Sequence, residues 1–227
     1  MLRCVSMSAQ NDGPAGPHAS QPVIFRGMPL SGARAAALMV HGRGATAEDI
    51  LALADQFHLP EFAYAAPQAA DNTWYPKRFL EPLENNEPWL SSALTFLEQT
   101  LQQIFDSGVP AERVVLLGFS QGACLALEFA ARHARRYGAI AGLSGALIGP
   151  DDASRQYPGS LDGTPIFLGC SDVDPHVPKE CVLQTAEVLQ QLGGRVTAQL
   201  YPEMAHTVNQ EEIEFVRALM RGLSAAA

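Results

Sequence analysis

Short apolar runs alternate with longer stretches of helical periodicity along most of this chain. Several of the short runs are nearly continuous in apolar residues, which is typical of strands that a parallel sheet buries on both faces. They lie at 35–41, 61–66, 113–119, 139–144, 165–169 and 195–201, and a weaker run at 23–26 could pair antiparallel at an edge. The alternation of strands and helices predicts a doubly wound, mostly parallel α/β sheet with right-handed crossovers.

Helical periodicity is clearest over 88–107, which carries an apolar stripe and ends at Gly108. Residues 46–57 begin with Thr46 and Asp49, which have the spacing of a capping box. Three further helices are expected over 120–132, 179–192 and 209–219. Ligands of doubly wound sheets bind at the carboxyl ends of the strands, so the residues there are the candidates for a functional site.

The length of 227 residues suits one substantial domain and is too short for two. Residues 1–20 are polar and rich in Gly and Pro, so we expect a disordered tail before a single domain over 21–227. Apolar residues make up 47% of the chain, and no apolar run approaches the roughly 18 residues that cross a bilayer. A globular protein without stable membrane insertion is expected. The N-terminus has no apolar segment of a secretory signal, which favours the cytoplasm.

Charge and cysteine content narrow the classes of function. A net charge of −9 disfavours nucleic acid or an anionic membrane as the main partner, because both bind clustered Lys and Arg. A basic patch around Arg43, Lys77 and Arg78 could offset this acidity locally. The cysteines have no CxxC or zinc-finger spacing and are expected to be buried free thiols. They are Cys4, Cys124, Cys170 and Cys181.

The segment Gly118-Phe119-Ser120-Gln121-Gly122 is a GxSxG sequence between a predicted strand and a predicted helix. A serine on such a sharp turn projects its hydroxyl above the sheet, and the glycines let the helix pass close to the strand. The N-terminus of the following helix favours developing negative charge. Ser120 is therefore the predicted nucleophile.

A serine hydroxyl needs a base, and the base needs a group that orients it. In this kind of fold the acid and then the histidine follow the serine along the chain, each in a loop after a strand. Of the six histidines, His206 lies after the last strand and before the last helix, where the base is expected. Asp172 and Asp174 both lie in the loop after the strand at 165–169, and spacing alone does not separate them.

Two N–H groups are expected to form an oxyanion hole, which stabilises the negative charge that develops on a carbonyl oxygen. One is the backbone N–H of Gln121, directly after the serine. The other is expected from Arg43, in the loop His41-Gly42-Arg43-Gly44, where glycines let the main chain approach a substrate. We interpret the Arg43 side chain as solvated and His41 as a structural residue that braces the loop.

Together these segments resemble the phospholipase/carboxylesterase family of α/β-hydrolases, which includes acyl-protein thioesterases and small bacterial carboxylesterases. The resemblance extends from about residue 38 to 215 and implies an α/β-hydrolase fold with helices on both faces of the sheet. It also implies cleavage of esters or thioesters through an acyl-serine, without a metal or cofactor, and it assigns the acid to Asp174. The matching segments are Val40-His41-Gly42-Arg43-Gly44, Gly118-Phe119-Ser120-Gln121-Gly122-Ala123, Leu143-Ser144-Gly145, Asp174-Pro175-His176-Val177-Pro178 and Met204-Ala205-His206.

Two stretches depart from the family pattern. Ala205 stands where a glycine commonly precedes the histidine, a mild change. Residues 72–80 differ from the corresponding stretch of the eukaryotic depalmitoylating enzymes and resemble a bacterial branch, which argues against a long-chain protein-acyl substrate. They belong to a long irregular segment (residues 71–89, the cover segment) placed where a substrate cover would lie. Its Trp74, Tyr75 and Phe79 either line an acyl pocket or fix the segment to the body.

The sequence therefore predicts a serine carboxylesterase or thioesterase that acts on a small-molecule ester or thioester with Ser120, His206 and Asp174. Alternatives on the same scaffold are a lysophospholipase, an acyltransferase, and a dienelactone-type enzyme, which often has cysteine in place of Ser120. A different class is a non-catalytic binding protein with the hydrolase fold. The oligomeric state is open, and a homodimer through an apolar cover segment is an alternative to the monomer.

Overall fold

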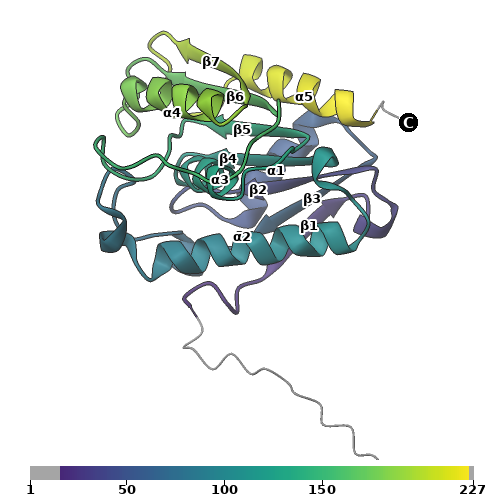
Figure 1. Cartoon of the computed structure of the whole chain (residues 1–227). Coiled ribbons are helices and arrows are strands. Elements are labelled where there is room, and N and C mark those ends of the chain that lie inside the picture. Colours follow the sequence, from purple (N-terminus) through teal and green to yellow (C-terminus); the bar gives the residue numbers. More distant parts are fainter. Residues whose placement is uncertain (1–15, 225–227) are drawn as a thin grey trace, which may run out of the picture.

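The computed structural model describes residues 16–224, which form one seven-stranded sheet with helices on both faces (Figure 1). The strand order is β1-β3-β2-β4-β5-β6-β7. Strand β1 pairs antiparallel with β3, and every other neighbouring pair is parallel. The fold class predicted from the sequence is therefore confirmed, including the antiparallel strand at one edge.

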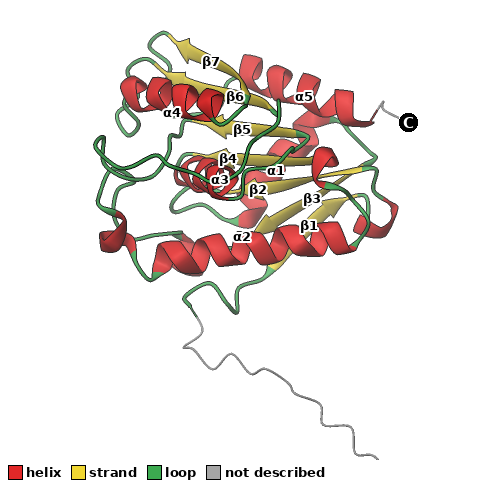
Figure 2. Ribbon diagram, viewed as in Figure 1, coloured by secondary structure: helices red, strands yellow, loops and turns green. Residues whose placement is uncertain are grey.

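The bounds of the elements agree with the predicted ranges to within a few residues (Figure 2). The exception is the last helix, which continues past residue 219. The strands are β1 (Val23–Gly27), β2 (Ala35–Val40), β3 (Phe62–Pro67), β4 (Val114–Phe119), β5 (Ala139–Leu143), β6 (Pro165–Ser171) and β7 (Arg195–Tyr201). The helices are α1 (Ala47–Phe57), α2 (Trp89–Asp106), α3 (Gln121–Arg132), α4 (Lys179–Gln191) and α5 (Gln210–Ser224). Within residues 16–224, no helix is long and apolar enough to cross a bilayer.

Two hydrophobic cores lie on opposite faces of the sheet. Helices α2, α3 and α4 pack over one face, which includes Leu38 and Leu116, and α1 and α5 pack over the other, which includes Met39 and Leu117. Successive side chains of a strand point to opposite faces, so a strand between two cores needs apolar residues at nearly every position. This double burial explains the continuous apolar runs of β2 and β4.

Helix α1 begins with the predicted capping box. The backbone N–H of Asp49 donates to Thr46 Oγ1 at 3.2 Å, and the Asp49 carboxylate accepts from the backbone N–H of Thr46 at 2.8 Å. The box satisfies N–H groups that have no carbonyl partner at a helix start. It also fixes the direction in which the chain leaves the loop after β2, which contains the candidate residue Arg43.

Residues 16–20 belong to the folded body, so the predicted tail boundary at residue 20 is wrong. His18 is fully buried, and its backbone N–H donates to Ser92 Oγ at 3.0 Å. The N–H of Ala70 donates to His18 Nδ1 at 3.1 Å, so Nε2 carries the proton and donates to the Trp74 carbonyl at 3.0 Å. One histidine thus anchors a segment whose composition is typical of a tail. Residues 1–15, with Cys4, and residues 225–227 lie outside the described residues.

Glu212, in the first turn of α5, is a carboxyl group buried against β6. Its Oε2 accepts from the Asn209 backbone N–H at 2.8 Å, and Asn209 Oδ1 accepts from the Glu212 backbone N–H at 2.9 Å, so the pair caps the helix. Its Oε1 is buried next to Gly169 and has no hydrogen-bond partner among residues 16–224. Burial raises the pKa of Glu212 to about 7, against the opposing effect of the Asn209 N–H.

The substitution Glu212→Gln is expected to remove a pH-dependent loss of stability. The pKa of Glu212 rises from an ordinary 4.5 to about 7 on folding, so the folded chain binds this proton more tightly. The stabilisation is fully present below the unfolded pKa and is lost as the pH rises through the folded one. Relative to the variant, the wild type should lose roughly 3 kcal/mol of unfolding free energy over this range. Denaturant unfolding at several pH values measures the difference, which would be constant if Glu212 did not titrate in this way.

Candidate active site

Ser120 lies on a tight turn between β4 and α3, with φ 54° and ψ −122°. The backbone of a residue other than glycine is strained in this region, and such a conformation persists only where the surrounding structure enforces it. A Cβ atom on Gly118 would overlap the carbonyl of Gly122, and one on Gly122 would overlap the carbonyl of Val40. The two glycines therefore let α3 pass against β2 and β4, and the predicted strand–turn–helix is present.

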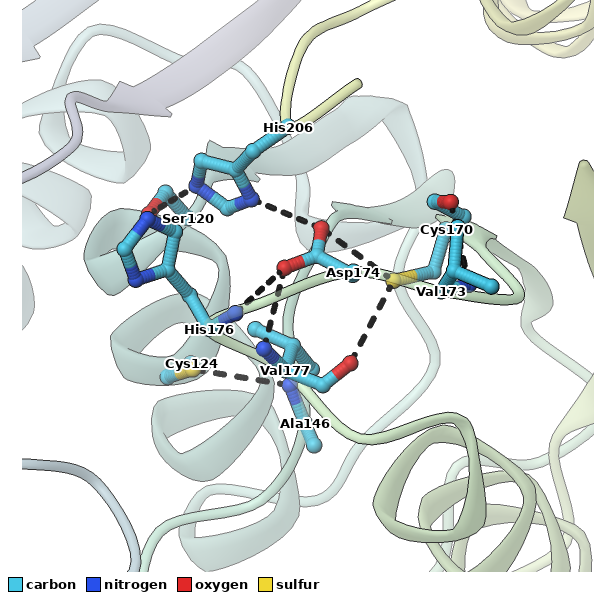
Figure 3. Close-up of polar contacts among 10 residues, drawn as sticks. Ser120, Cys124, Ala146, Cys170, Val173, Asp174, His176, Val177 and His206 are labelled. Atoms are coloured by element: carbon cyan, nitrogen blue, oxygen red, sulfur yellow. Dashed lines mark hydrogen bonds and ion pairs between the residues drawn. The ribbon is translucent and has the colours of Figure 1, made fainter. Parts of the chain in front are cut away.

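His206 lies between Ser120 and Asp174 (Figure 3). Its Nε2 is 2.8 Å from Ser120 Oγ, and its Nδ1 is 2.7 Å from Asp174 Oδ2. Because a carboxylate only accepts, Nδ1 carries the proton of the neutral ring, and Nε2 is free to accept from the serine hydroxyl. The three residues follow β4, β6 and β7 at the carboxyl edge of the sheet. The structure thus brings together the three side chains that the sequence selects.

Asp174 is held as a carboxylate although its side chain is 0% exposed. Burial alone would raise the pKa of Asp174, but hydrogen bonds outweigh it. His206 approaches Oδ2, and the backbone N–H groups of His176 and Val177 donate to Oδ1 at 2.8 Å and 3.0 Å. These contacts hold the pKa of Asp174 below its ordinary value. The carboxylate is therefore ionised at neutral pH and favours a proton on the facing imidazole nitrogen.

Asp172, the alternative acid, makes a different contact. Its Oδ1 accepts from the backbone N–H of Glu203 at 2.8 Å, and Glu203 has a left-handed φ of 53°. This bond fixes the turn that precedes His206. The structure therefore separates the two aspartates that spacing leaves equivalent: Asp174 contacts the imidazole, and Asp172 holds the loop that carries it.

His41 determines the orientation of the peptide unit that carries the Arg43 N–H. The backbone N–H of Ala69 donates to His41 Nε2 at 3.1 Å, so His41 Nδ1 carries the proton and donates to the Gly42 carbonyl at 2.8 Å. In a planar trans peptide the carbonyl and the N–H point in opposite directions, so the Arg43 N–H points away from the buried imidazole. Burial lowers the pKa of His41, which keeps the ring neutral. The structural role expected for His41 is confirmed.

Gln121, which carries the second expected N–H, is the first residue of α3. Its backbone N–H therefore has no carbonyl partner within the helix and is free to bind a ligand. Its side chain is committed to the cover segment, because Nε2 donates to the Tyr75 carbonyl at 2.8 Å and Oε1 accepts from the Trp74 backbone N–H at 2.9 Å. Gln121 and Arg43 both line the cavity that contains Ser120.

This cavity has a volume of about 550 Å³, and Ser120 and His206 are among the residues that line it. Tyr75 and Phe79 line it, as expected, but Trp74 does not. The Trp74 ring is fully buried, and its Nε1 donates to the His41 carbonyl at 2.8 Å. The expectation that Trp74 lines an acyl pocket is therefore wrong, and it fixes the cover segment to the body instead. The remaining lining residues are Arg43, Pro76, Lys77, Arg78, Glu81, Gln121, Cys124, His176 and Val177.

Arg43 is exposed, as expected of a solvated residue, but its side chain is also bound to the cover segment. Its guanidinium donates to the carbonyls of Tyr75, Pro76 and Lys77 at 2.9, 2.9 and 2.6 Å. Three carbonyls that converge on one guanidinium hold the cover segment in place. The sequence identifies Arg43 as a candidate but contains no pattern that links it to a segment more than thirty residues away.

Two further residues at the site are not among the sequence candidates. Asn86 is fully buried, its Oδ1 accepts from the Lys77 backbone N–H at 2.8 Å, and its Nδ2 donates to the Arg78 carbonyl at 3.2 Å. His176 lines the cavity with its ring centroid 4.8 Å from that of His206. Its place two residues after Asp174 is a usable sequence signal, whereas nothing distinguishes Asn86. Within residues 16–224, no cluster of His, Cys, Asp and Glu could hold a metal ion.

Residues 28–223 match the family model described as Phospholipase/Carboxylesterase. The chain belongs to the phospholipase/carboxylesterase family. A crystal structure of a phospholipase/carboxylesterase from Dyadobacter fermentans is 40% identical in sequence and superposes with a TM-score of 0.86. That comparison covers 89% of this chain and 97% of the other. The resemblance inferred from the sequence motifs is therefore confirmed.

The curated relatives of this chain include fungal proteins. Acyl-protein thioesterase 1 of Gibberella zeae is 36% identical over 135 residues, which are 56% of this chain and 54% of that protein. Acyl-protein thioesterase 1 of Saccharomyces cerevisiae is 30% identical over 132 residues, which are 57% of this chain and 58% of that protein. The chain thus spans just over half the length of the curated relatives it matches.

The family segment Leu143-Ser144-Gly145 supports the serine turn. The backbone N–H of Ser120 donates to the Leu143 carbonyl at 2.9 Å, and a Cβ atom on Gly145 would overlap that of Ala123 in α3. The end of β5 and the start of α3 therefore pack without an intervening side chain. This contact gives a physical reason for a small residue at position 145.

The substitution Gly122→Ala is expected to destabilise the chain by about 1–3 kcal/mol, because the new methyl group meets two backbone carbonyls that cannot rotate away. Gly222→Ala is the matched control. A Cβ atom on Gly222 meets no other atom within 4 Å, and alanine there favours α5, so that variant should gain about 0.5–1 kcal/mol. Denaturant unfolding of both variants measures the effects. A Gly122→Ala variant as stable as the wild type would contradict the close approach at the serine turn.

Proposed function

We propose that this chain is a serine hydrolase that cleaves carboxylic esters or thioesters through an acyl-serine intermediate. The observation that carries the proposal is the hydrogen-bonded series from Ser120 Oγ through His206 to Asp174, with distances of 2.8 Å and 2.7 Å. Membership of the phospholipase/carboxylesterase family supports it, as do relatives named acyl-protein thioesterase.

In the acylation half of the proposed reaction, Ser120 Oγ attacks the carbonyl carbon of the substrate while His206 Nε2 accepts the hydroxyl proton. Asp174 stabilises the imidazolium that forms. The backbone N–H groups of Arg43 and Gln121 donate to the developing oxyanion. His206 then protonates the leaving alcohol or thiol. Water attacks the acyl-serine with the same groups in reverse order, which releases the carboxylic acid and restores Ser120.

The proposed substrate is a small-molecule ester or thioester whose apolar part lies against Tyr75 and Phe79, both of which line the cavity. A serine at the nucleophile position favours cleavage of an open-chain ester or thioester over dienelactone-type opening of a lactone ring. Cys124, Cys170 and Cys181 are free thiols, which agrees with the proposed cytoplasmic location. A homodimer stays a prediction.

The substitution Ser120→Ala should reduce turnover of a para-nitrophenyl short-chain ester by roughly 10⁶-fold, because the attacking atom is removed. Release of nitrophenolate measures turnover, and denaturant unfolding of the variant checks that the fold is retained. A folded variant that keeps more than a few per cent of wild-type turnover would show that Ser120 is not the nucleophile.

Substitution of the two aspartates separates their roles. Asp174→Asn should lower kcat by about 10⁴-fold, because an amide that donates to Nδ1 favours the wrong imidazole tautomer. Asp172→Asn should stay much closer to the wild type, because the amide oxygen can still accept the Glu203 N–H. The same ester assay measures both variants. Equal losses would contradict the assignment of Asp174 as the residue that orients His206.

A further inference from the structure

The cavity at Ser120 is positively charged in a chain that is negatively charged overall. The chain has 24 Asp and Glu residues against 15 Lys and Arg, a net charge of −9. The cavity is nevertheless lined by Arg43, Lys77 and Arg78, against Glu81 as its one acidic lining residue. A local field of this sign attracts anions to a site on a molecule whose net charge repels them.

Lys77 and Arg78 have no counterion among residues 16–224, where neither charged group takes part in an ion pair or hydrogen bond. Glu81 forms no ion pair with either of them and accepts instead from the neutral amide of Asn85 at 3.2 Å. Its single negative charge leaves a net charge of +2 on the Lys, Arg and Glu side chains that line the cavity. The Arg43 guanidinium binds carbonyls, which carry no net charge. Like charges gathered in one cavity repel each other, and a bound anion would relieve that repulsion.

The main chain that presents these cations is fixed from both sides. Buried Asn86 binds the N–H of Lys77 and the carbonyl of Arg78. Arg43 and Gln121 both donate to the carbonyl of Tyr75. Because the backbone at Lys77 and Arg78 is already ordered, binding an anion there requires only the two side chains to be immobilised.

We propose that the natural substrate of the hydrolase carries an anionic group, a carboxylate or a phosphate, which Lys77 and Arg78 bind while Ser120 attacks the ester carbonyl. The inference rests on the proposed function and adds the chemical class of the substrate. An arginine binds either anion with two parallel hydrogen bonds, and a lysine adds a compact positive charge. The anion lies on the acyl part or on the leaving group, and the experiment has an arm for each.

Two pairs of matched esters test the proposal. For the acyl part, the para-nitrophenyl monoester of adipic acid is compared with the para-nitrophenyl ester of adipamic acid, its neutral amide. For the leaving group, meta-carboxyphenyl butanoate is compared with meta-carbamoylphenyl butanoate. In at least one of the two pairs, the kcat/KM of the anionic ester should exceed that of its neutral counterpart about 10-fold or more. Equal values within both pairs would overturn the proposal.

Charge variants test whether Lys77 and Arg78 cause the preference for the anionic ester. Lys77→Gln and Arg78→Gln should each lower kcat/KM about 5-fold more for the preferred anionic ester than for its neutral counterpart. The matched control is Arg34→Gln, which removes one positive charge at an exposed position. Arg34 directly precedes β2 and so lies at the amino end of that strand, whereas Ser120 follows the carboxyl end of β4. The control variant should change kcat/KM for neither ester. Raising the salt concentration from about 0.01 M to 1 M should shrink the preference, because screening shortens from about 30 Å to 3 Å.

A binding measurement separates this inference from the hydrolase function. Calorimetric titration of the Ser120→Ala variant should show that the anionic ester binds at least about 5-fold more tightly than its neutral counterpart, and Lys77→Gln in that background should shrink the difference. If the anionic ester binds more tightly but the wild type hydrolyses no ester, the result would count against the hydrolase function and support the anion site.

If hydrolysis depends on Ser120 but the anionic and neutral esters have equal kcat/KM, the anion site alone would be overturned. An equal loss of kcat/KM on both esters in the Lys77→Gln variant would overturn it as well.

Discussion

Ser120 faces His206 because two glycines let α3 approach β2 and β4 more closely than any side chain would allow. A Cβ atom on Gly118 or Gly122 would occupy the position of a neighbouring carbonyl group. The resulting turn holds Ser120 at a positive φ, a conformation that a serine adopts only when the surrounding packing enforces it. The sheet, the helix and the two cores therefore all contribute to the position of one hydroxyl group.

The two residues proposed as oxyanion donors also hold the cover segment. Arg43 and Gln121 both line the cavity, and the side chains of both bind the carbonyl of Tyr75. The walls of the cavity and the groups expected to stabilise the oxyanion are thus parts of one hydrogen-bonded unit. Displacement of the cover segment would disturb both, and the cations at Lys77 and Arg78 belong to the same unit.

The sequence predicts the fold well because its signals are local. Apolar runs define the strands, Thr46 and Asp49 mark the start of α1, and the chain order of Ser120, Asp174 and His206 follows from the order of the strands. Contacts between distant segments are the part that sequence reasoning misses. His18 binds the Trp74 carbonyl 56 residues away, and no periodicity or composition indicates that bond. The sequence does not predict the binding of Arg43 to three carbonyls for the same reason, since these carbonyls lie in an irregular segment.

Covalent labelling of the folded chain with a fluorophosphonate, followed by mass spectrometry of its peptides, tests directly whether Ser120 is an activated nucleophile. Such a probe reacts with a serine whose hydroxyl is activated by a base and whose neighbouring N–H groups accommodate a developing oxyanion. A single adduct on Ser120 is expected, and it should be lost when His206 is replaced by alanine. A folded protein that stays unlabelled, or that carries the adduct on another residue, would contradict the assignment of Ser120 as the nucleophile.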